Sequence, residues 1–449
     1  MQNTKLNILV YLMLSVDNIN ADSNYIIVKQ LCNKLIKTGK YNFFILLDKN
    51  RKYYKDDLHK SVKIIWLPLP RSKKHQVIHF NTNIFREIYK KYAIDLVWNN
   101  VVERGHHIRY FQDTLLDNQR VKVLNYHHYV IHRSLEYLSN YLPCTHILYD
   151  QIIGSLGADL NYFHTQHCYN MLIEEAKDIL LPDQVKKIED KSIVKLGGYI
   201  NKIKSKYKYE TYTFIYNHRL DGYKNWKDTF EVFDLLYNAG YKFKVIITAG
   251  DKGNLGSLNK EYVEIKSFSL HSDYINELSK CHCNVINSRH ETYCISIAES
   301  ILNDQIIVAP NKVTFPELVD QDYPYLFESK EEQHKILENL IVNNIREYNY
   351  KESNKLTIDQ HSKNFDKIIT DLFEKDLYES YFDRIKKEST KKEIKNYLQT
   401  RNEIDLTDFK NFIFKLGYAS QSFPMSKIKK ILNEFNFEYI TFTNKYQKK

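Results

Sequence analysis

Two glutamates lie close together in a segment that otherwise carries little charge. The stretch SRHETYCISIAES (288–300) contains Glu291 and Glu299, separated by seven residues. At the rise of a helix, eight residues cover at most about 12 Å. Two carboxylates at this spacing can accept hydrogen bonds from hydroxyls at two places along one extended polyhydroxy ligand. The alternative is an exposed glutamate followed by one that complements a helix dipole.

Two cations lie earlier in the chain, at a second junction of a strand with a helix. Arg219 and Lys224 are five residues apart in YNHRLDGYKNW (216–226), after the apolar run TYTFIY and before a helical pattern. Such a junction offers free backbone N–H groups, and cations beside it can complete a diphosphate site. The alternative is a pair of solvated loop cations.

Histidines are the third group of residues that could take part in chemistry. His127 and His128 end the apolar run VKVLNYHHYV (121–130). Successive side chains of a strand point to opposite faces, so only one of them should face a ligand. The alternative is a core or surface imidazole pair. The stretch HTQHC (164–168) has no matching Cys or His pair at a useful spacing, so no metal site is predicted.

The elements that must position these residues alternate between apolar strands and amphipathic helices. In the second half, strands are expected at ETYTFIYNHR (210–219), KFKVIITAGD (242–251), YVEIKSF (262–268), CNVINS (283–288) and QIIVAP (305–310). Helices are expected between them at 224–240, 272–281 and 296–303. This alternation predicts a parallel sheet covered on both faces, with ligands at the carboxyl ends of its strands. Glu291 and Arg219 both follow such strand ends.

The first half shows the same alternation. Strands are expected at KLNILVYLML (5–14), YNFFILLD (41–48), SVKIIWLPL (61–69), IDLVWNN (94–100) and 121–130, with a helix over 24–39. We therefore predict an α/β protein in which two Rossmann-like domains face a cleft, with a small, basic, mostly helical module after them. The predicted domains are residues 1–195, 196–380 and 381–449, and the last is winged-helix-like.

Residues 195–375 resemble the donor domain of retaining glycosyltransferases with the GT-B fold, and the first half resembles that family by architecture. Such domains have an arginine and a lysine, then two glutamates separated by seven residues, and later a Pro-Glu pair. The matching residues here are Arg219, Lys224, Glu291, Glu299, Pro316 and Glu317.

The resemblance implies a role for each charged residue. Arg219 and Lys224 would neutralise the donor diphosphate as it leaves, Glu291 would hold sugar hydroxyls, and Glu299 would hold ribose hydroxyls. His127 or His128 would lie against the transferred sugar. The resemblance also implies a nucleotide-sugar donor, a UDP-sugar, and catalysis without a metal or another cofactor.

The sequence departs from the family pattern in the loops that surround the donor. The family has Gly-Phe-Gly after the first glutamate, where this chain has Thr292, Tyr293 and Cys294, and we expect Tyr293 and Cys294 to contact the donor. SVDNINADSN (15–24) replaces a glycine pair, and Asn303-Asp304-Gln305 replaces Gly-x-Pro.

The acceptor is indicated by charge and by loop position. From Arg384 to Lys449 the chain has 15 Lys or Arg against 7 Asp or Glu, a net of +8 out of +10 for the whole chain. With Lys427, Lys429 and Lys430 on one predicted helix, this end is typical of a module that binds nucleic acid. On the first-domain loops, three further polar residues could contact an acceptor: Asp22, Asn24 and Glu103.

A hydroxylated base in nucleic acid, as in modified phage DNA, is therefore the expected acceptor. The alternative is a transferase of surface glycan or glycolipid synthesis, whose basic end contacts an anionic membrane. A third reading, from another class, is a non-catalytic protein that binds sugar nucleotides or nucleic acid. No signal peptide or membrane-spanning stretch is recognisable, and six scattered cysteines indicate reduced thiols, so a cytoplasmic location is expected. For a phage protein this would be the host cytoplasm.

Overall fold

The computed structural model describes residues 5–12, 22–48, 58–67, 82–115, 121–132, 145–198, 200–202, 207–248, 258–268, 270–386, 388–401, 403–405, 408–409, 411–412, 432, 437–440 and 445–448. The chain divides into two compact units, Met1–Asp366 and Lys367–Lys449. Both α/β sheets belong to the first unit, so the predicted boundaries at residues 195 and 380 stay predictions.

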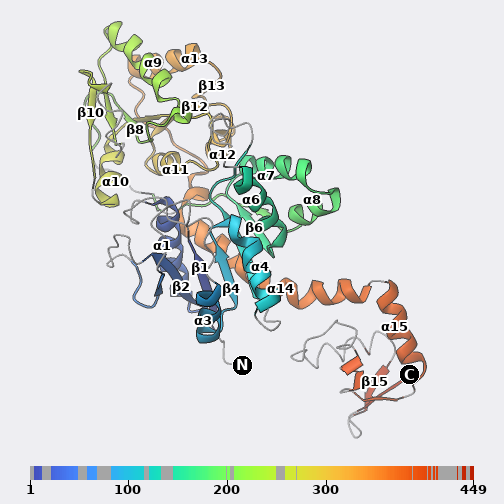
Figure 1. The fold of residues 1–449 in the computed structure, drawn as a ribbon. Coiled ribbons are helices and arrows are strands. Elements are labelled where there is room, and N and C mark those ends of the chain that lie inside the picture. The colour runs from blue at the N-terminus through green and yellow to red at the C-terminus, as the bar shows by residue number, and fades with distance from the viewer. Residues whose placement is uncertain are drawn as a thin grey trace. The chain divides into compact units, whose positions relative to one another are not determined.

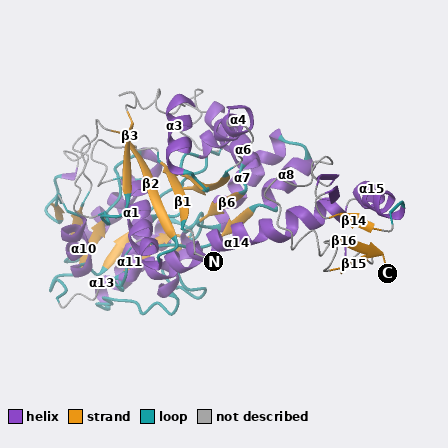
Figure 2. Cartoon of the chain, turned by 90° about the horizontal axis from the view of Figure 1, so that it is seen from below, coloured by secondary structure: helices purple, strands orange, loops and turns teal. Residues whose placement is uncertain are grey.

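The first sheet contains seven parallel strands in the order β3-β2-β1-β4-β5-β6-β7 (Figure 1). Its strands are β1 (Leu6–Tyr11), β2 (Tyr41–Asp48), β3 (Lys63–Leu67), β4 (Leu96–Asn99), β5 (Lys122–His127), β6 (Leu160–Phe163) and β7 (Ser192–Val194). The five strands predicted from apolar runs are confirmed. β6 and β7 were missed because neither belongs to a longer apolar run: β6 (LNYF) is interrupted by an asparagine, and β7 (SIV) has only three residues. Figure 2 shows β3, β2, β1 and β6 in this spatial order.

Helices cover this sheet because its strands are apolar on both faces. They are α1 (Ser23–Leu35), α3 (Thr82–Tyr92), α4 (Gly105–Leu115), α6 (Thr145–Gly157), α7 (Gln166–Ile179) and α8 (Pro182–Glu189). One face of the sheet packs on α3 and α4 through residues such as Phe85 and Phe111. On another part of the sheet, Trp98 contacts the ring of Phe365, with the ring centroids 4.7 Å apart.

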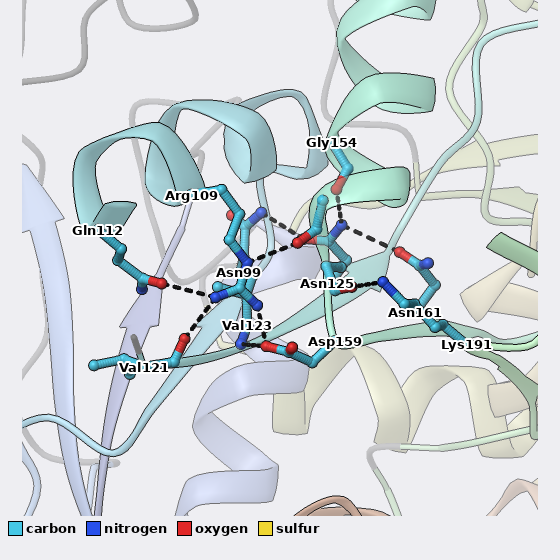
Figure 3. A network of polar contacts seen from close by, with 12 residues as sticks. Asn99, Arg109, Gln112, Val121, Val123, Asn125, Gly154, Asp159, Asn161 and Lys191 are labelled. Atoms are coloured by element: carbon cyan, nitrogen blue, oxygen red, sulfur yellow. Dashed lines mark hydrogen bonds and ion pairs between the residues drawn. The ribbon is translucent and has the colours of Figure 1, made fainter. Parts of the chain in front are cut away.

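A buried polar network joins three adjacent strands of the first sheet, two of which, β5 and β6, end at the cavity described below (Figure 3). Asn99, Asn125 and Asn161, on the adjacent strands β4, β5 and β6, form a ladder of side-chain hydrogen bonds of 2.7 and 3.2 Å. Asn125 also donates to the carbonyl of Gly154 in α6. A Cβ at Gly154 would lie 2.1 Å from the Val102 carbonyl oxygen, so glycine is required where α6 meets this segment.

The second sheet contains six parallel strands in the order β10-β9-β8-β11-β12-β13. They are β8 (Thr213–Tyr216), β9 (Lys244–Ile247), β10 (Val263–Ile265), β11 (Cys283–Val285), β12 (Ile306–Pro310) and β13 (Leu326–Phe327). Its helices are α9 (Trp226–Asn238), α10 (His271–Lys280), α11 (Ile295–Leu302), α12 (Phe315–Leu318) and α13 (Lys330–Val342). Phe214 packs toward α9 and α13, whereas the next residue, Ile215, packs toward α10. This alternation buries both faces, as predicted for a parallel sheet.

The last part of the chain combines helices with a small sheet. Helix α14 (Ile358–Lys386) contains the division between the two units, and α15 (Glu388–Gln399) follows it. Strands β14 (Glu403–Asp405), β15 (Phe437–Ile440) and β16 (Lys445–Lys448) form an antiparallel sheet in the order β14-β16-β15. The sequence predicted one strand here. The two additional strands are only three and four residues long, too short to give a recognisable alternation.

Candidate active site

A cavity of about 600 Å³ lies where strands of both sheets end. The first sheet contributes His128 and His164, which directly follow β5 and β6, and the start of α1 contributes Asn24. The second sheet contributes residues from the loops after β8, β9 and β11, together with the first turns of α10 and α11. They include Asn217, Arg219, Lys224, Thr248, His271, Tyr274, Glu291, Tyr293, Cys294 and Glu299. Ligands are expected at this edge of parallel sheets.

The second sheet contributes the charged wall of the cavity, which carries Arg219, Lys224, Glu291 and Glu299. Within it, Lys224 and Glu291 form a buried ion pair. The Lys224 ammonium contacts Glu291 Oε1, and the two side chains are only 10% and 11% exposed. Burial by itself lowers the pKa of Lys224, but the Glu291 carboxylate outweighs burial, so the pKa is raised and the amine stays charged. Removing either charge would leave the other buried without a counter-charge.

Arg219 is the exposed cation of this wall. It donates a 2.6 Å hydrogen bond to the Tyr223 hydroxyl and lies 3.3 Å from the Asp221 carboxylate. Its side chain is 69% exposed, so the guanidinium remains available to a ligand at the cavity mouth. Arg219 and Lys224 therefore meet at one cavity, at the strand–turn–helix junction that the sequence indicated.

Glu299 is held by two side chains from α10. His271 Nε2 lies 2.6 Å from Oε1, and the Tyr274 hydroxyl donates to Oε2 over 2.9 Å. Asn217 in turn donates to the Tyr274 hydroxyl over 2.7 Å. Each carboxylate oxygen keeps a further lone pair, so Glu299 can still accept hydrogen bonds from a diol. His271 and Tyr274 were missed in the sequence, although their spacing of three residues at a predicted helix start was a usable signal.

The loop after Glu291 is fixed to the first sheet by three hydrogen bonds. The Thr292 hydroxyl donates to the His128 carbonyl over 2.8 Å, and the Thr292 carbonyl accepts from Thr165 over 2.6 Å. The Tyr293 hydroxyl donates to the Gly197 carbonyl. Thr292, which replaces the first glycine of the family pattern, and Tyr293, which replaces its phenylalanine, are therefore accommodated by bonds across the two sheets.

Cys294 lines the cavity in a left-handed conformation, with a φ of 61° just before α11. Glycine is the residue best suited to such a backbone, so the cysteine carries some strain here. Burial raises the pKa of its thiol to about 12, which keeps it protonated.

The two neighbouring histidines have different surroundings, as strand alternation requires. His127 is buried, stacks on Phe163 and lies 3.4 Å from Asn161 Oδ1. His128 lines the cavity, and its Nε2 lies 2.8 Å from Asn100 Oδ1. Burial lowers the pKa of both imidazoles to about 3, so both are neutral at physiological pH. The structure thus brings His128, and not His127, to the cavity.

The residues suggested for the acceptor lie in varied places. Asn24 lines the cavity, whereas Asp22 is buried and caps α1 by accepting from the backbone N–H groups of Asn24 and Tyr25. Glu103 is buried away from the cavity and accepts from the Tyr129 hydroxyl. Burial raises the Glu103 pKa. The remaining acceptor residues, Lys427, Lys429 and Lys430, lie outside the described residues.

Glu317, of the Pro-Glu pair, joins the two sheets in a way the sequence did not indicate. Its carboxylate accepts from the backbone N–H groups of Gln166 and His167, at 2.6 and 2.7 Å. These are the first residues of α7, so a side chain from α12 caps a helix of the first sheet. The cap fixes the start of α7, which directly follows His164 and Thr165 in the chain.

No group of three or more His, Cys, Asp or Glu side chains in the described parts of the chain has a metal-binding arrangement. His164, of the HTQHC stretch, instead stacks on Tyr293 with the ring centroids 4.4 Å apart. Over the same parts of the chain, every helix is too short or too polar to cross a membrane.

Comparison with known proteins places the fold. Solved structures share it at low sequence identity: sucrose-phosphate synthase of Thermosynechococcus elongatus (TM-score 0.62, 11% identity), Anabaena HepE with UDP-glucose (0.58, 12%) and the lipopolysaccharide outer core galactosyltransferase WaaB (0.57, 13%). Each match covers 82% of this chain and 99% or more of the other chain. No protein-family model matches, and no curated protein matches significantly. The chain therefore has the two-domain GT-B fold, as predicted.

Proposed function

We propose that this protein is a retaining glycosyltransferase that moves a sugar from a UDP-sugar to a hydroxyl of the acceptor. The observation that carries the proposal is the meeting of Arg219, Lys224, Glu291 and Glu299 at one cavity between two parallel sheets. The cations Arg219 and Lys224 match the diphosphate of such a donor. Glu299, whose carboxylate can accept hydrogen bonds from two neighbouring hydroxyls, matches its ribose, and the buried carboxylate of Glu291 matches its sugar. HepE, which shares the fold, was solved with UDP-glucose and with UDP and glucose.

In this proposal the charged wall acts on the leaving group. The bond from the sugar's anomeric carbon to the diphosphate oxygen breaks, and a bond to the acceptor oxygen forms on the same face. The acceptor's proton passes to the leaving phosphate. Arg219 and Lys224 stabilise the charge that develops on the diphosphate, which is where preorganised cations are most effective. Glu291 orients sugar hydroxyls while remaining paired with Lys224.

For the acceptor, we propose a hydroxylated base in nucleic acid. Its support is the net charge of +8 between Arg384 and Lys449. The order of α15, β14 and then a hairpin whose second strand pairs with β14 is compatible with a winged-helix module. A domain of this kind would bring the enzyme to DNA through phosphate contacts and leave recognition of the base to the catalytic cavity.

A second candidate acceptor is a surface glycan or glycolipid. The observation that favours it is the likeness to WaaB, a lipopolysaccharide galactosyltransferase. In that case the basic end of the chain would contact anionic lipid rather than nucleic acid.

The experiment offers a panel of UDP-sugars with duplex DNA containing 5-hydroxymethylcytosine, and unmodified duplex as a control. A sugar-sized mass gain on the modified nucleoside, formed about 10²–10³-fold more slowly with Glu291→Gln, is the expected result. Donor hydrolysis without transfer to DNA would contradict the nucleic-acid acceptor and favour the glycan. Neither hydrolysis nor transfer with any donor would favour a non-catalytic binding protein.

The basic end can be tested separately by salt dependence of DNA binding. Replacing Lys427, Lys429 and Lys430 by serine should reduce the slope of log affinity against log salt by about 2.7, at roughly 0.9 per phosphate contact. An unchanged slope would contradict a role for these lysines in nucleic-acid binding.

A further inference from the structure

His218 is a buried imidazole in the loop that also carries the two cations of the charged wall. It follows β8 by two residues and directly precedes Arg219. It lines the cavity but is only 4% exposed. After burial, the charge of Lys224 is the second cause that lowers the pKa of this imidazole, so the two side chains lie close together. His218 therefore lies at the end of the cavity that is proposed to hold the diphosphate.

The imidazole is joined to a hydroxyl at the start of α11. His218 Nδ1 lies 3.0 Å from Ser296 Oγ, and Ser296 also lines the cavity. Ser296 is the second residue of α11, where the positive end of the helix favours an anion. A hydroxyl can accept one hydrogen bond while it donates another. When Nδ1 carries a hydrogen, Ser296 can therefore accept it and donate its own hydrogen to a ligand in the cavity.

A second polar side chain favours the charged form of His218. Asn284, on β11, donates through Nδ2 to Asn217 and Ser300 over 2.8 and 2.7 Å. Its Oδ1 is sealed from solvent and, like His218 Nε2, has no hydrogen-bond partner at ordinary distance within the described residues. Burial lowers the pKa of His218 well below its ordinary value, whereas the Asn284 amide acts in the opposite direction, because its oxygen can accept a hydrogen from the charged ring. The imidazole is thus neutral at physiological pH, with acceptors in place for a charged form.

The other titratable groups around His218 are uncharged or paired. Tyr216, on β8, packs edge-on against the imidazole with the ring centroids 5.3 Å apart, and burial raises the pKa of its hydroxyl. Cys294, just before α11, keeps its proton for the same reason. Lys224 is paired with Glu291. An anion that enters the cavity would therefore be the largest new influence on the charge of the imidazole.

The cavity offers a diphosphate no excess of fixed positive charge. Among the described residues that line it, the Lys, Arg, Asp and Glu side chains are Arg219, Lys224, Glu291 and Glu299. Their charges cancel, whereas each phosphate of a nucleotide sugar is ionised at neutral pH. A nearby anion stabilises the charged form of an imidazole. His218, beside Lys224, is placed to supply a further positive charge at the diphosphate.

We propose that His218 takes up a proton when a diphosphate ligand enters the cavity, and that the charged imidazole orients Ser296 to donate a hydrogen bond to a diphosphate oxygen. The proton comes from the solvent, and Nδ1 and Nε2 then both carry hydrogen. The inference rests on the proposed function and adds two residues to its diphosphate site: Ser296, which would bind the ligand, and His218, which would position it. The added charge would also stabilise the leaving group.

Calorimetry in buffers of different ionisation enthalpy counts the protons that the protein takes up on binding. The probe is the methyl ester of UDP at its terminal phosphate. This ester has the diphosphate of a nucleotide sugar without the sugar, and it lacks the terminal phosphate group that titrates in UDP at about pH 6. At pH 6, the wild type should take up at least roughly half a proton for each ester bound.

Two variants assign the proton. His218→Gln should bind the ester without proton uptake and roughly tenfold more weakly. His127→Gln is its matched control, because His127 is also buried and neutral but does not line the cavity, and its uptake should equal that of the wild type. Ser296→Ala keeps the imidazole, and it should weaken the ester roughly tenfold and reduce the uptake. Ser272→Ala removes an exposed hydroxyl that does not line the cavity and should alter neither quantity.

The outcomes separate this inference from the function on which it rests. Ester binding to the wild type without proton uptake would overturn the inference and leave the proposed donor standing. Uptake that persists in His218→Gln would overturn it too, because the proton would then belong to another group. If His218→Gln does not fold, uptake and affinity in Ser296→Ala equal to those of the wild type would have the same consequence. Failure of the ester to bind the wild type would contradict the proposed donor and, with it, this inference.

Discussion

The two walls of the cavity differ in charge. The wall from the second sheet carries Arg219, Lys224, Glu291 and Glu299, each held by a charged or hydrogen-bonding partner. The wall from the first sheet carries imidazoles such as His128, which burial keeps neutral. In the proposed function, the first of these walls holds the anionic diphosphate and its nucleotide, and the second contacts the uncharged part of the donor.

The difference teaches why one wall was easier to recognise in the sequence than the other. On the first-sheet side the sequence suggested His128 and Asn24, which line the cavity, together with His127, Asp22 and Glu103, which do not. A charge in a buried loop is costly unless it has a partner or a ligand, so a spaced set of charges at strand ends carries positional information. A neutral polar residue at a strand end has many structural uses. Asn99, at the end of β4, belongs to a hydrogen-bonded ladder and does not line the cavity.

The largest effect should come from the charge at the centre of the charged wall. Glu291→Gln keeps the size of the side chain and should lower sugar transfer by about 10²–10³-fold, because an interaction made in the transition state is lost. It also leaves Lys224 without its counter-charge, so stability should fall by up to about 3 kcal/mol. Transfer rates and urea unfolding measure the two effects.

The matched control for this substitution is Glu331→Gln, an exposed glutamate in the first turn of α13. It should leave transfer unchanged and alter stability by no more than about 0.5 kcal/mol. If Glu291→Gln transferred sugar at a rate within tenfold of the wild type, the proposed role of the charged wall in the reaction would be contradicted.

A smaller effect, confined to ligand binding, is expected at Arg219. Its side chain is exposed, so Arg219→Ala should change stability by no more than about 0.5 kcal/mol while weakening UDP roughly tenfold. Lys227→Ala removes an exposed cation three residues after Lys224 that does not line the cavity, and it should leave UDP affinity unchanged. Equal losses of UDP affinity in the two variants, measured by calorimetry, would contradict a specific diphosphate site and indicate non-specific electrostatic attraction.

His127, the buried neighbour of the cavity residue His128, should make stability depend on pH. Burial lowers the folded-state pKa of His127 to about 3, against about 6.5 in the unfolded chain. As the pH falls below 6.5, the unfolded state therefore takes up a proton that the folded state does not. His127 should make unfolding easier toward acid by up to about 1.4 kcal/mol per pH unit. Urea unfolding at pH 7 and pH 5 should give a smaller difference for His127→Gln than for the wild type, and equal differences would contradict a neutral, buried imidazole.

The smallest effect is expected where the two sheets meet. Glu317→Gln has one acceptor oxygen where two are needed, so one N–H group at the start of α7 loses its partner. Stability should fall by about 1 kcal/mol, as for loss of a helix cap, with UDP affinity unchanged. Thermal unfolding measures the loss, and an unchanged midpoint would show that the cap contributes nothing.

Much of the fold follows from the sequence because strand and helix periods are explicit in it. Apolar runs predicted β1, β2, β3, β4 and β5, and the alternation predicted two parallel sheets. Short elements were missed, because the four residues of β6 include the buried Asn161 and give no apolar run.

The candidate site, like the fold, could be predicted from the sequence only in part. The positions of Glu291 in a loop and Glu299 within a helix follow from local patterns, and both are confirmed. The pairing of Lys224 with Glu291 joins residues 67 positions apart, and the contact of Glu299 with His271 joins residues 28 apart. Such contacts depend on how the strands assemble, which a single sequence does not contain. The roles of these residues in catalysis, and those suggested for Lys427, Lys429 and Lys430, stay predictions.

The most direct measurement of the central claim is calorimetric binding of UDP to the wild type and to Glu299→Leu. The wild type should bind one UDP, and the variant should bind it at least roughly tenfold more weakly, because the ribose hydroxyls lose their acceptor. No UDP binding by the wild type, or equal affinity in the two proteins, would contradict a nucleotide-sugar site at this cavity.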